Sequence, residues 1–255
     1  PSWLSDLSAD WRGRVVESMA PATGEGAASP GGRGTAVARA LVLGDPSALG
    51  PDVRRGLAAN GLAHLLALSG LHVGLLAALV LALTAPLPRT LRWLLVLPAV
   101  AAYLLLAGPR PSLLRASLMV AALVLSRLAE RPPSPANALS LAVLALVLHR
   151  PAVVWAWGFQ LTVAATAGIL LLSPRLAGRW RRPAGLLPAP VAQALAVTVA
   201  AQAATLPFVL PKIAGLSPLA PLWNLLAVPW AVLALAASMG WVLLALACPA
   251  AAAGL

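Results

Sequence analysis

The sequence predicts an all-α membrane protein, a multi-pass bundle of about seven transmembrane helices with short amphipathic helices at its N-terminus. Hydrophobic residues make up 60% of the 255 residues and charged residues only 10%, whereas soluble domains contain roughly 45–50% and 25%. The apolar residues form runs close to the roughly 20 residues that a helix needs to cross a bilayer. Most of the 18 basic residues lie between these runs, as in loops that fix membrane topology.

Residues 1–60 contain no run long enough to span a membrane. The stretch GTAVARALVLGD (34–45) combines spaced apolar residues with Arg39, which predicts a short amphipathic helix on or near the membrane surface. A second short helix is predicted to begin at Pro51, because proline is favoured in the first turn. We therefore expect an extramembrane amphipathic and linker segment in residues 1–60 and the transmembrane domain in residues 61–255.

The ends of the chain and its single cysteine also limit the interpretation. The sequence begins at Pro1 and finishes in an apolar run, CPAAAAGL, so we expect it to be part of a longer protein, truncated at both ends. No cleavable signal peptide is visible. Because Cys248 is alone and only three histidines occur, the sequence predicts no internal disulfide, no metal site and no cofactor.

Seven apolar segments follow, and several contain residues that weaken a helix. Proline removes a backbone donor and clashes with the preceding turn, so prolines inside a segment predict kinks. The last segment is long, with Asn224 ahead of a proline, which suggests a broken or re-entrant first half. The predicted hinges or breaks are Gly70, Gly74, Pro98, Pro207 and Pro229. The segments are residues 61–84, 91–108, 112–128, 135–149, 152–172, 190–210 and 219–247.

Basic residues in the loops predict the orientation of these segments. By the positive-inside rule, the loops richer in Lys and Arg face the cytoplasm. The loops after the first, third and fifth segments are the richer set, so residues 1–60 are expected on the extracytoplasmic side. The basic residues of this set are Arg89, Arg92, Arg127, Arg131, Arg175, Arg179, Arg181 and Arg182. Those of the other set are Arg110, Arg150 and Lys212.

Arg115 lies inside the third apolar segment, in SLLRASLMVAALVLS. An arginine at the centre of a bilayer costs about 2.5–3.5 kcal/mol on insertion scales and is usually functional. Helical spacing places Arg115 on one stripe with Ser112, Met119 and Ser126. Two interpretations stay open. Either the side chain snorkels to the nearby interface, or it provides a fixed positive charge beside a water-filled path.

The first segment, GLAHLLALSGLHVGLLAALVLAL, carries His64, Ser69 and His72 at membrane depth. A metal site would need more ligands than the chain offers nearby. Ser69 and His72, at i and i+3, could form a nucleophile pair, but no nearby acid is available to orient the imidazole. The other interpretations are a polar gate segment loosened by glycine, and histidines that hydrogen-bond neighbouring helices.

Uncharged polar residues occupy the later segments. Thr198, Gln202 and Thr205 share one helical face, and Gln160 and Thr162 lie close together in the fifth segment. In membrane bundles such side chains commonly join neighbouring helices through hydrogen bonds. The alternative is that they line a polar path and make exchangeable contacts with its cargo.

Carboxylates are almost absent from the apolar part of the chain. After Asp52 the only acidic residue is Glu130, and the net charge is +11. Ion-coupled transporters usually rely on intramembrane Asp or Glu, so a passive or externally powered conduit is favoured. A strongly basic body with few acids could also face a polyanion.

Several motifs, in the same order, resemble the ComEC/Rec2 family of competence proteins, the inner-membrane channels for DNA uptake in natural transformation. HLLALSGLHVGLL resembles the signature of that family, and PSLLRASLMV resembles its Arg-Ala-x-x-Met segment. NALSLAVLALVLHRPAVVWAWGFQLTVAATAGILLLSP is similar to its stretch around Gly-Phe-Gln-Leu-Ser, and AQAATLPFVLPKIAGLSPLAPLWNLLAVP to its later block. The resemblance covers roughly residues 35–247.

The chain departs from the family pattern at two places. Thr162 stands where Ser is expected, which keeps the hydroxyl group. His149-Arg150-Pro151 stands where an acid before the proline is common, which puts a specific role of that loop in doubt. Full-length members commonly add an OB-like and a metallo-β-lactamase-like domain. No His-x-His-x-Asp-His motif occurs in this sequence, so we expect no nuclease activity from it.

The resemblance implies a channel, not an enzyme, that passes one DNA strand across the bacterial cytoplasmic (inner) membrane. Its implied partners are single-stranded DNA, the lipid bilayer, a DNA receptor and a cytoplasmic helicase or motor, and it forms within one chain or as a homodimer. The alternatives are an anion or lipid-linked substrate transporter and an intramembrane Ser/His hydrolase. The expected DNA-path residues are His64, Ser69, His72, Arg110, Arg115, Gln160, Thr162, Gln202 and Asn224.

Overall fold

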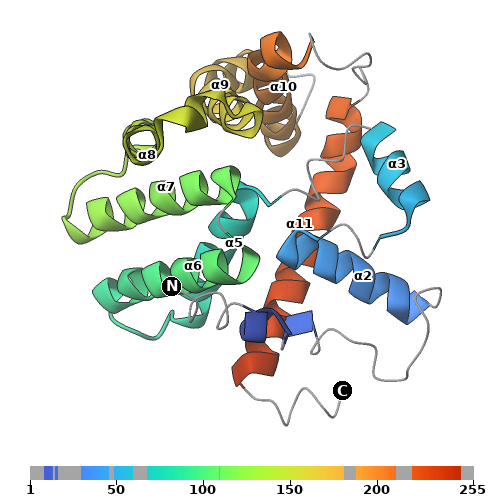
Figure 1. Ribbon diagram of the computed structural model, residues 1–255. Helices are drawn as coiled ribbons and strands as arrows, with labels where there is room; N and C mark the ends of the chain where they lie inside the picture. The colour runs from blue at the N-terminus through green and yellow to red at the C-terminus, as the bar shows by residue number, and fades with distance from the viewer. Residues whose placement is uncertain are drawn as a thin grey trace.

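A computed structural model gives the fold of the chain (Figure 1). It describes residues 9–13, 15–16, 30–45, 49–59, 68–108, 110–180, 188–210 and 220–247. Within these residues the structure is helical, with short turns and loops and no β-strand. The predicted all-α class is therefore confirmed.

The helices follow the apolar segments of the sequence closely. For most helices the observed and predicted bounds differ by only a few residues. The apolar runs and the prolines between them determine both the predicted and the observed bounds. The elements are α2 (Pro30–Leu43), α3 (Pro51–Ala59), α5 (Gly70–Leu83), α6 (Arg89–Ala107), α7 (Pro111–Leu128), α8 (Pro135–His149), the 3₁₀ helix η2 (Pro151–Trp155), α9 (Trp157–Trp180), α10 (Ala189–Val209) and α11 (Ala220–Ala247).

Five of the described helices are long and apolar enough to cross a membrane, namely α6, α7, α9, α10 and the 225–242 part of α11. Helices α5 and α8 are apolar but have only 14 and 15 residues. At 1.5 Å per residue they extend about 21 and 22 Å, less than the roughly 30 Å of a hydrocarbon core. The five long helices fit a multi-pass membrane protein, and the count of seven crossings stays a prediction.

The first predicted segment, residues 61–84, is described from residue 68 onward, and in that part its helix begins at Gly70. Ser69 has extended backbone angles (φ −132°, ψ 179°) and is the N-cap of α5, which begins at Gly70. Residues 61–67, including His64, lie outside the described residues. The helix starts here because serine is a favoured N-cap, whose side-chain oxygen accepts a bond from a first-turn N–H group.

Prolines lie inside several helices without ending them. Helix α11 continues through Pro229, and so departs from the expected broken or re-entrant first half. Helix α9 continues through Pro174 to Trp180, so Arg175 and Arg179 lie on helix rather than in the predicted loop. A proline removes one backbone donor, and in an apolar helix local adjustments and neighbouring groups satisfy the carbonyl that is freed.

The main core lies between α5, α6, α7 and α11. Its fully buried members include Val73, Val96 and Leu113, each 0% exposed. Helix α7 packs against α5 and α6 on one side and against α8 and α9 on the other, and Figure 1 shows α9 and α10 together beyond α8. The fold therefore has two groups of helices that meet at α7.

The C-terminal end of α2 enters the main core. The sequence predicts this helix on or near the membrane surface, but Ala40, Leu41, Val42 and Leu43 are all buried, and α2 packs against α6 and α11. The reason is its last turn, a continuous apolar run that would be exposed on a polar surface. Only the first part of the helix keeps the exposure expected of an amphipathic surface helix.

Candidate functional site

Two polar clusters lie where helices of the bundle meet. The first, the Arg115 cluster, joins α7 to α9. The Arg115 guanidinium donates through Nη1 to the carbonyl oxygen of Thr162 and, at 2.8 Å, to the hydroxyl of Thr166. That hydroxyl donates in turn to the same Thr162 carbonyl over 2.8 Å. Thr162 and Thr166 are one turn apart on α9, so a single helix face holds the arginine.

The positive charge of Arg115 has no counterion among the described residues. The side chain is only 5% exposed, its described partners are neutral oxygens, and its Nε has no hydrogen-bond partner. A snorkelling side chain would instead place its guanidinium in water at the interface. A buried cation without a partner charge is costly and attracts anions strongly, because the low dielectric weakens screening.

The second cluster, the α2 cap, surrounds the C-terminal end of α2. The last carbonyls of a helix have no partners within it. Here two side chains from other elements bond to such carbonyls, and a third donates to the carbonyl of Gly44, which follows the helix. His72 Nε2 lies 2.9 Å from the Leu41 oxygen, the Tyr103 hydroxyl donates to Val42 over 2.8 Å, and Arg110 Nη1 donates to Gly44 over 3.0 Å. The α2 cap thus ties α2 to α5, to α6 and to the residue preceding α7.

His72 occupies the centre of the α2 cap. It is 1% exposed, and its Nδ1 accepts the backbone N–H of Ser69 at 3.2 Å. The opposite ring nitrogen faces a carbonyl oxygen, which can only accept, so we assign the neutral imidazole with its proton on Nε2. One ring nitrogen bonds to the N-cap residue of α5 and the other to a carbonyl of α2, so the imidazole links the two helices.

Ser69 and His72 are close enough to have suggested nucleophilic chemistry. Their Oγ and Nδ1 atoms lie 3.3 Å apart. However, Nδ1 also accepts the Ser69 backbone N–H, and Ser69 Oγ accepts the N–H of Leu71 at 3.3 Å. These are the reciprocal bonds of a helix N-cap. The geometry favours capping of α5 over activation of the hydroxyl.

A family comparison supplies the assignment that these clusters leave open. A family model described as "Competence protein" matches residues 41–255. This chain belongs to the competence protein family. The match includes both clusters, and it agrees with the ComEC/Rec2 resemblance of the sequence motifs. No curated protein and no solved structure gives a significant match.

The remaining predicted path residues of this competence protein make local contacts. Gln160 donates through Nε2 to the Val154 oxygen at 2.9 Å, which ties the start of α9 to η2. The Thr162 hydroxyl donates to the Phe159 oxygen at 3.0 Å. Gln202 is half-buried on α10, and its backbone oxygen accepts from Thr205. The side chain of Asn224 on α11, like all of His64, is outside the described part.

The structure therefore unites some of the predicted residues and leaves others apart. It places Arg115 with Thr162, and it places Ser69, His72 and Arg110 around the end of α2. Two participants were not predicted, Thr166 and Tyr103. Thr166 repeats Thr162 one turn later, and Tyr103 is the only tyrosine of the chain. Those were the signals available in the sequence, although neither identifies a partner.

Proposed function

We propose that this competence protein conducts single-stranded DNA across the cytoplasmic membrane and performs no catalytic step itself. Its membership in the competence family and its five long apolar helices support a membrane role in DNA uptake. The observation that carries the proposal is Arg115, which is 5% exposed and has only neutral oxygen partners among the described residues. A buried cation without a counterion in that part of the chain favours a cargo that is itself negatively charged, such as a nucleic acid strand.

In this proposal Arg115 attracts the backbone phosphates of the strand one after another. Thr162 and Thr166 are the partners of the guanidinium in the conformation described here, and a phosphate takes their place when a strand passes. A single arginine contacts one phosphate at a time, so the strand advances by exchanging one phosphate for the next. The apolar part of the chain offers little repulsion to a polyanion, because Glu130 is its only acid and is exposed.

The conformation described here corresponds to a closed channel in this proposal. Helix α9 covers Arg115, so a strand could reach the guanidinium only if α9 moved away from α7. Helix α9 packs mainly on α10 and far less on α7, so α9 and α10 can move together as a unit. A cytoplasmic helicase or motor would supply the work, because the chain lacks the intramembrane acids that ion coupling usually uses.

Replacement of Arg115 tests the proposal. Arg115→Ala is expected to abolish uptake of labelled DNA by competent cells, and Arg115→Lys to keep part of it because the charge remains. Arg179→Ala, which removes an exposed cation from the end of α9, is the matched control and should leave uptake unchanged. Membrane levels of each variant are measured in parallel. Normal uptake by a normally inserted Arg115→Ala protein contradicts the proposal.

The alternative functions give different results. A carrier of small anions or lipid-linked substrates would use the same guanidinium, but protein in liposomes would then transport a small anion and exclude a DNA strand. A Ser/His hydrolase would lose essentially all activity in Ser69→Ala. The proposed channel should lose only part of its DNA uptake in that variant, because the change removes a helix cap worth about 1 kcal/mol.

A further inference from the structure

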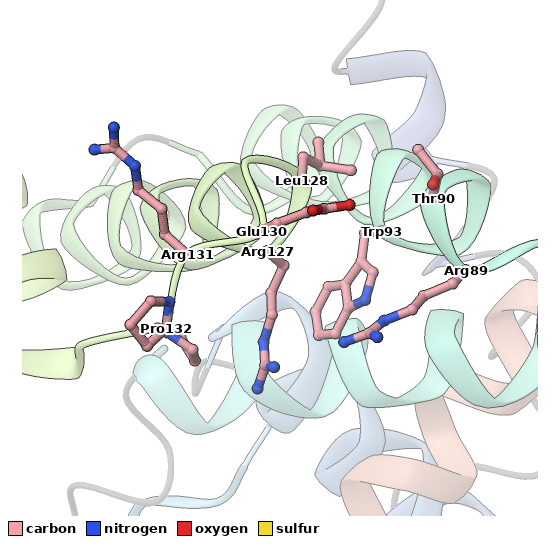
Figure 2. Close-up of a pocket in the computed structure, with 9 residues that line it drawn as sticks. Arg89, Thr90, Trp93, Arg127, Leu128, Glu130, Arg131 and Pro132 are labelled. Carbon is pink, nitrogen blue, oxygen red and sulfur yellow. The ribbon is translucent and has the colours of Figure 1, made fainter.

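A basic pocket lies at one end of α6 and α7, apart from both clusters described above (Figure 2). Its volume is about 510 Å³. The start of α6 contributes Arg89 and Trp93, which lie on one helix face at i and i+4. The end of α7 and the turn after it contribute Arg127, Glu130 and Arg131. The helix ends themselves thus build the pocket.

The turn after α7 is held in a defined conformation. The N–H of Arg131 donates to the Ser126 oxygen at 2.9 Å, and the N–H of Glu130 donates to the Arg127 oxygen at 3.3 Å. This is the Schellman pattern, in which a left-handed residue follows the helix and is usually glycine. Here that residue is Glu130, with φ +56°. The turn therefore fixes the backbone positions from which the Arg127 and Arg131 side chains extend.

The pocket carries an excess of positive charge. Three guanidinium groups line it against one carboxylate, and none of these four groups forms an ion pair in the described part of the chain. The Arg127 guanidinium lies 5.8 Å from the centroid of the Trp93 ring, which is a cation–π distance. Figure 2 shows the Arg89 and Arg127 guanidinium groups beside that indole, with Arg131 pointing away from them.

The start of α6 adds a second attraction for anions. Its N-cap is Pro88, which makes no side-chain capping bond. The first N–H groups of the helix therefore lack a side-chain acceptor at the cap, and they carry the positive end of the helix dipole. Arginine pairs and helix N-termini both favour phosphate oxygens. Both features favour a phosphate group as the ligand of this pocket.

The surroundings of the pocket favour a membrane lipid as the source of that phosphate. Helices α6 and α7 are both long enough to span, so their ends lie near the membrane–water interface, where tryptophan is enriched. Leu91, Leu94 and Leu125, on the same two helices, are 42%, 44% and 57% exposed. These leucines do not line the pocket, but they expose apolar surface to acyl chains on the two helices whose ends form the cationic site.

We infer that this pocket binds the phosphate headgroup of an anionic phospholipid. The positive-inside prediction places Arg89, Arg127 and Arg131 on the cytoplasmic side, where basic pockets between transmembrane helices bind anionic headgroups. The bound lipid would hold the start of α6 and the end of α7 together. The inference does not depend on the proposed DNA path, because no residue of the Arg115 cluster or the α2 cap lines the pocket.

The test is a titration of the purified protein in detergent with phosphatidylglycerol, followed by native mass spectrometry. Wild-type protein should bind phosphatidylglycerol in preference to phosphatidylcholine. Arg89→Gln/Arg127→Gln should weaken binding about thirtyfold, from five- to sixfold for each arginine near an anionic surface. The control Arg175→Gln/Arg179→Gln removes the same charge from α9 and should bind as wild type. Equal affinities of the two double variants would overturn the inference.

Two further measurements keep the result decisive. Glu130→Gly removes the carboxylate and suits the left-handed turn, so it should bind phosphatidylglycerol about fivefold more tightly than wild type. It remains informative if the double arginine variant fails to fold, and unchanged affinity would count against the inference. Competition separates the phosphate sources. Displacement of the lipid by equimolar glycerol phosphate or by a short single-stranded oligonucleotide would also overturn a lipid site.

Discussion

Gly44 shows how closely a single residue is constrained at the α2 cap. Its φ is +61°, and an added Cβ would lie 2.5 Å from Leu68 Cγ and 2.9 Å from Arg110 Nη1. Gly44→Ala should therefore lower the free energy of unfolding by roughly 2 kcal/mol or more, from left-handed strain and overpacking together. The melting temperature in detergent measures this loss.

Gly34, in the helix α2 that Gly44 follows, provides the control for that measurement. An added Cβ at Gly34 would meet nothing within 4 Å. Gly34→Ala should be neutral or stabilising by about 0.5–1 kcal/mol, because alanine is a better helix former than glycine. Equal melting temperatures for Gly34→Ala and Gly44→Ala would show that the α2 cap is not packed as described.

Removing the Tyr103 hydroxyl tests whether its hydrogen bond holds α2 against the other helices. Tyr103→Phe leaves the buried Val42 oxygen without this donor, at a cost of about 1–3 kcal/mol. We expect faster hydrogen exchange over residues 40–44 and unchanged exchange in α9 and α10, which make no contact with this hydroxyl. Unaltered exchange over residues 40–44 would mean that the bond does not anchor α2.

The sequence drew attention to the buried polar residues Arg115 and His72 better than to their partners. Arg115 and His72 stand out because charged and polar groups are rare in apolar segments. Their partners are distant in the chain, since Thr166 follows Arg115 by 51 positions and Leu41 precedes His72 by 31. Leu41 contributes only a backbone oxygen, which no side-chain pattern can reveal. Burial and contact were needed to separate snorkelling from an interior cation.

Among the elements, α9 and α10 form the closest pair. A Cβ added at Gly168 of α9 would lie 2.4 Å from Ala204 Cβ and 2.8 Å from the Ala200 oxygen. Small residues at such contacts let membrane helices approach closely. Gly168→Val should therefore force the two helices apart and cost roughly 1–3 kcal/mol, measured as a lower melting temperature or a loss of folded protein.

Gly178 is the control for Gly168, because it lies on the same helix with nothing within 4 Å of an added Cβ. Gly178→Val should melt close to wild type. Ala204→Gly should restore part of the stability of Gly168→Val by removing one of the two close contacts. If Gly168→Val and Gly178→Val melt alike, the close α9–α10 contact is refuted.

The positions of the helices were predictable because apolar runs of bilayer length usually form membrane-spanning helices. The exact helix ends near prolines were harder to predict. Pro229 was expected to break α11 and Pro174 lay beyond the predicted end of α9, yet both helices continue. Whether a proline ends a helix depends on what satisfies the freed carbonyl, and that depends on neighbouring helices. The burial of the end of α2 depends on tertiary packing in the same way.

On the scale of the whole molecule, the two groups of helices meet at α7, and Arg115 lies where α7 faces α9. In the proposed closed state this contact covers the guanidinium, so conduction requires the α9–α10 unit to move away from α7. The same residues then serve two states. Thr162 and Thr166 hold Arg115 when the channel is closed, and a phosphate replaces them as its partner when a strand passes.

Crosslinking during DNA uptake measures directly whether the strand passes Arg115. A photoactivatable side chain at position 166 lies beside the guanidinium, whereas one at Leu171, 60% exposed on the same helix, serves as the control. With uptake in progress, we predict crosslinks to labelled DNA from position 166 and few or none from position 171. No crosslink from position 166 in protein that still takes up DNA, or equal crosslinks from both positions, would contradict a DNA path along α7 and α9.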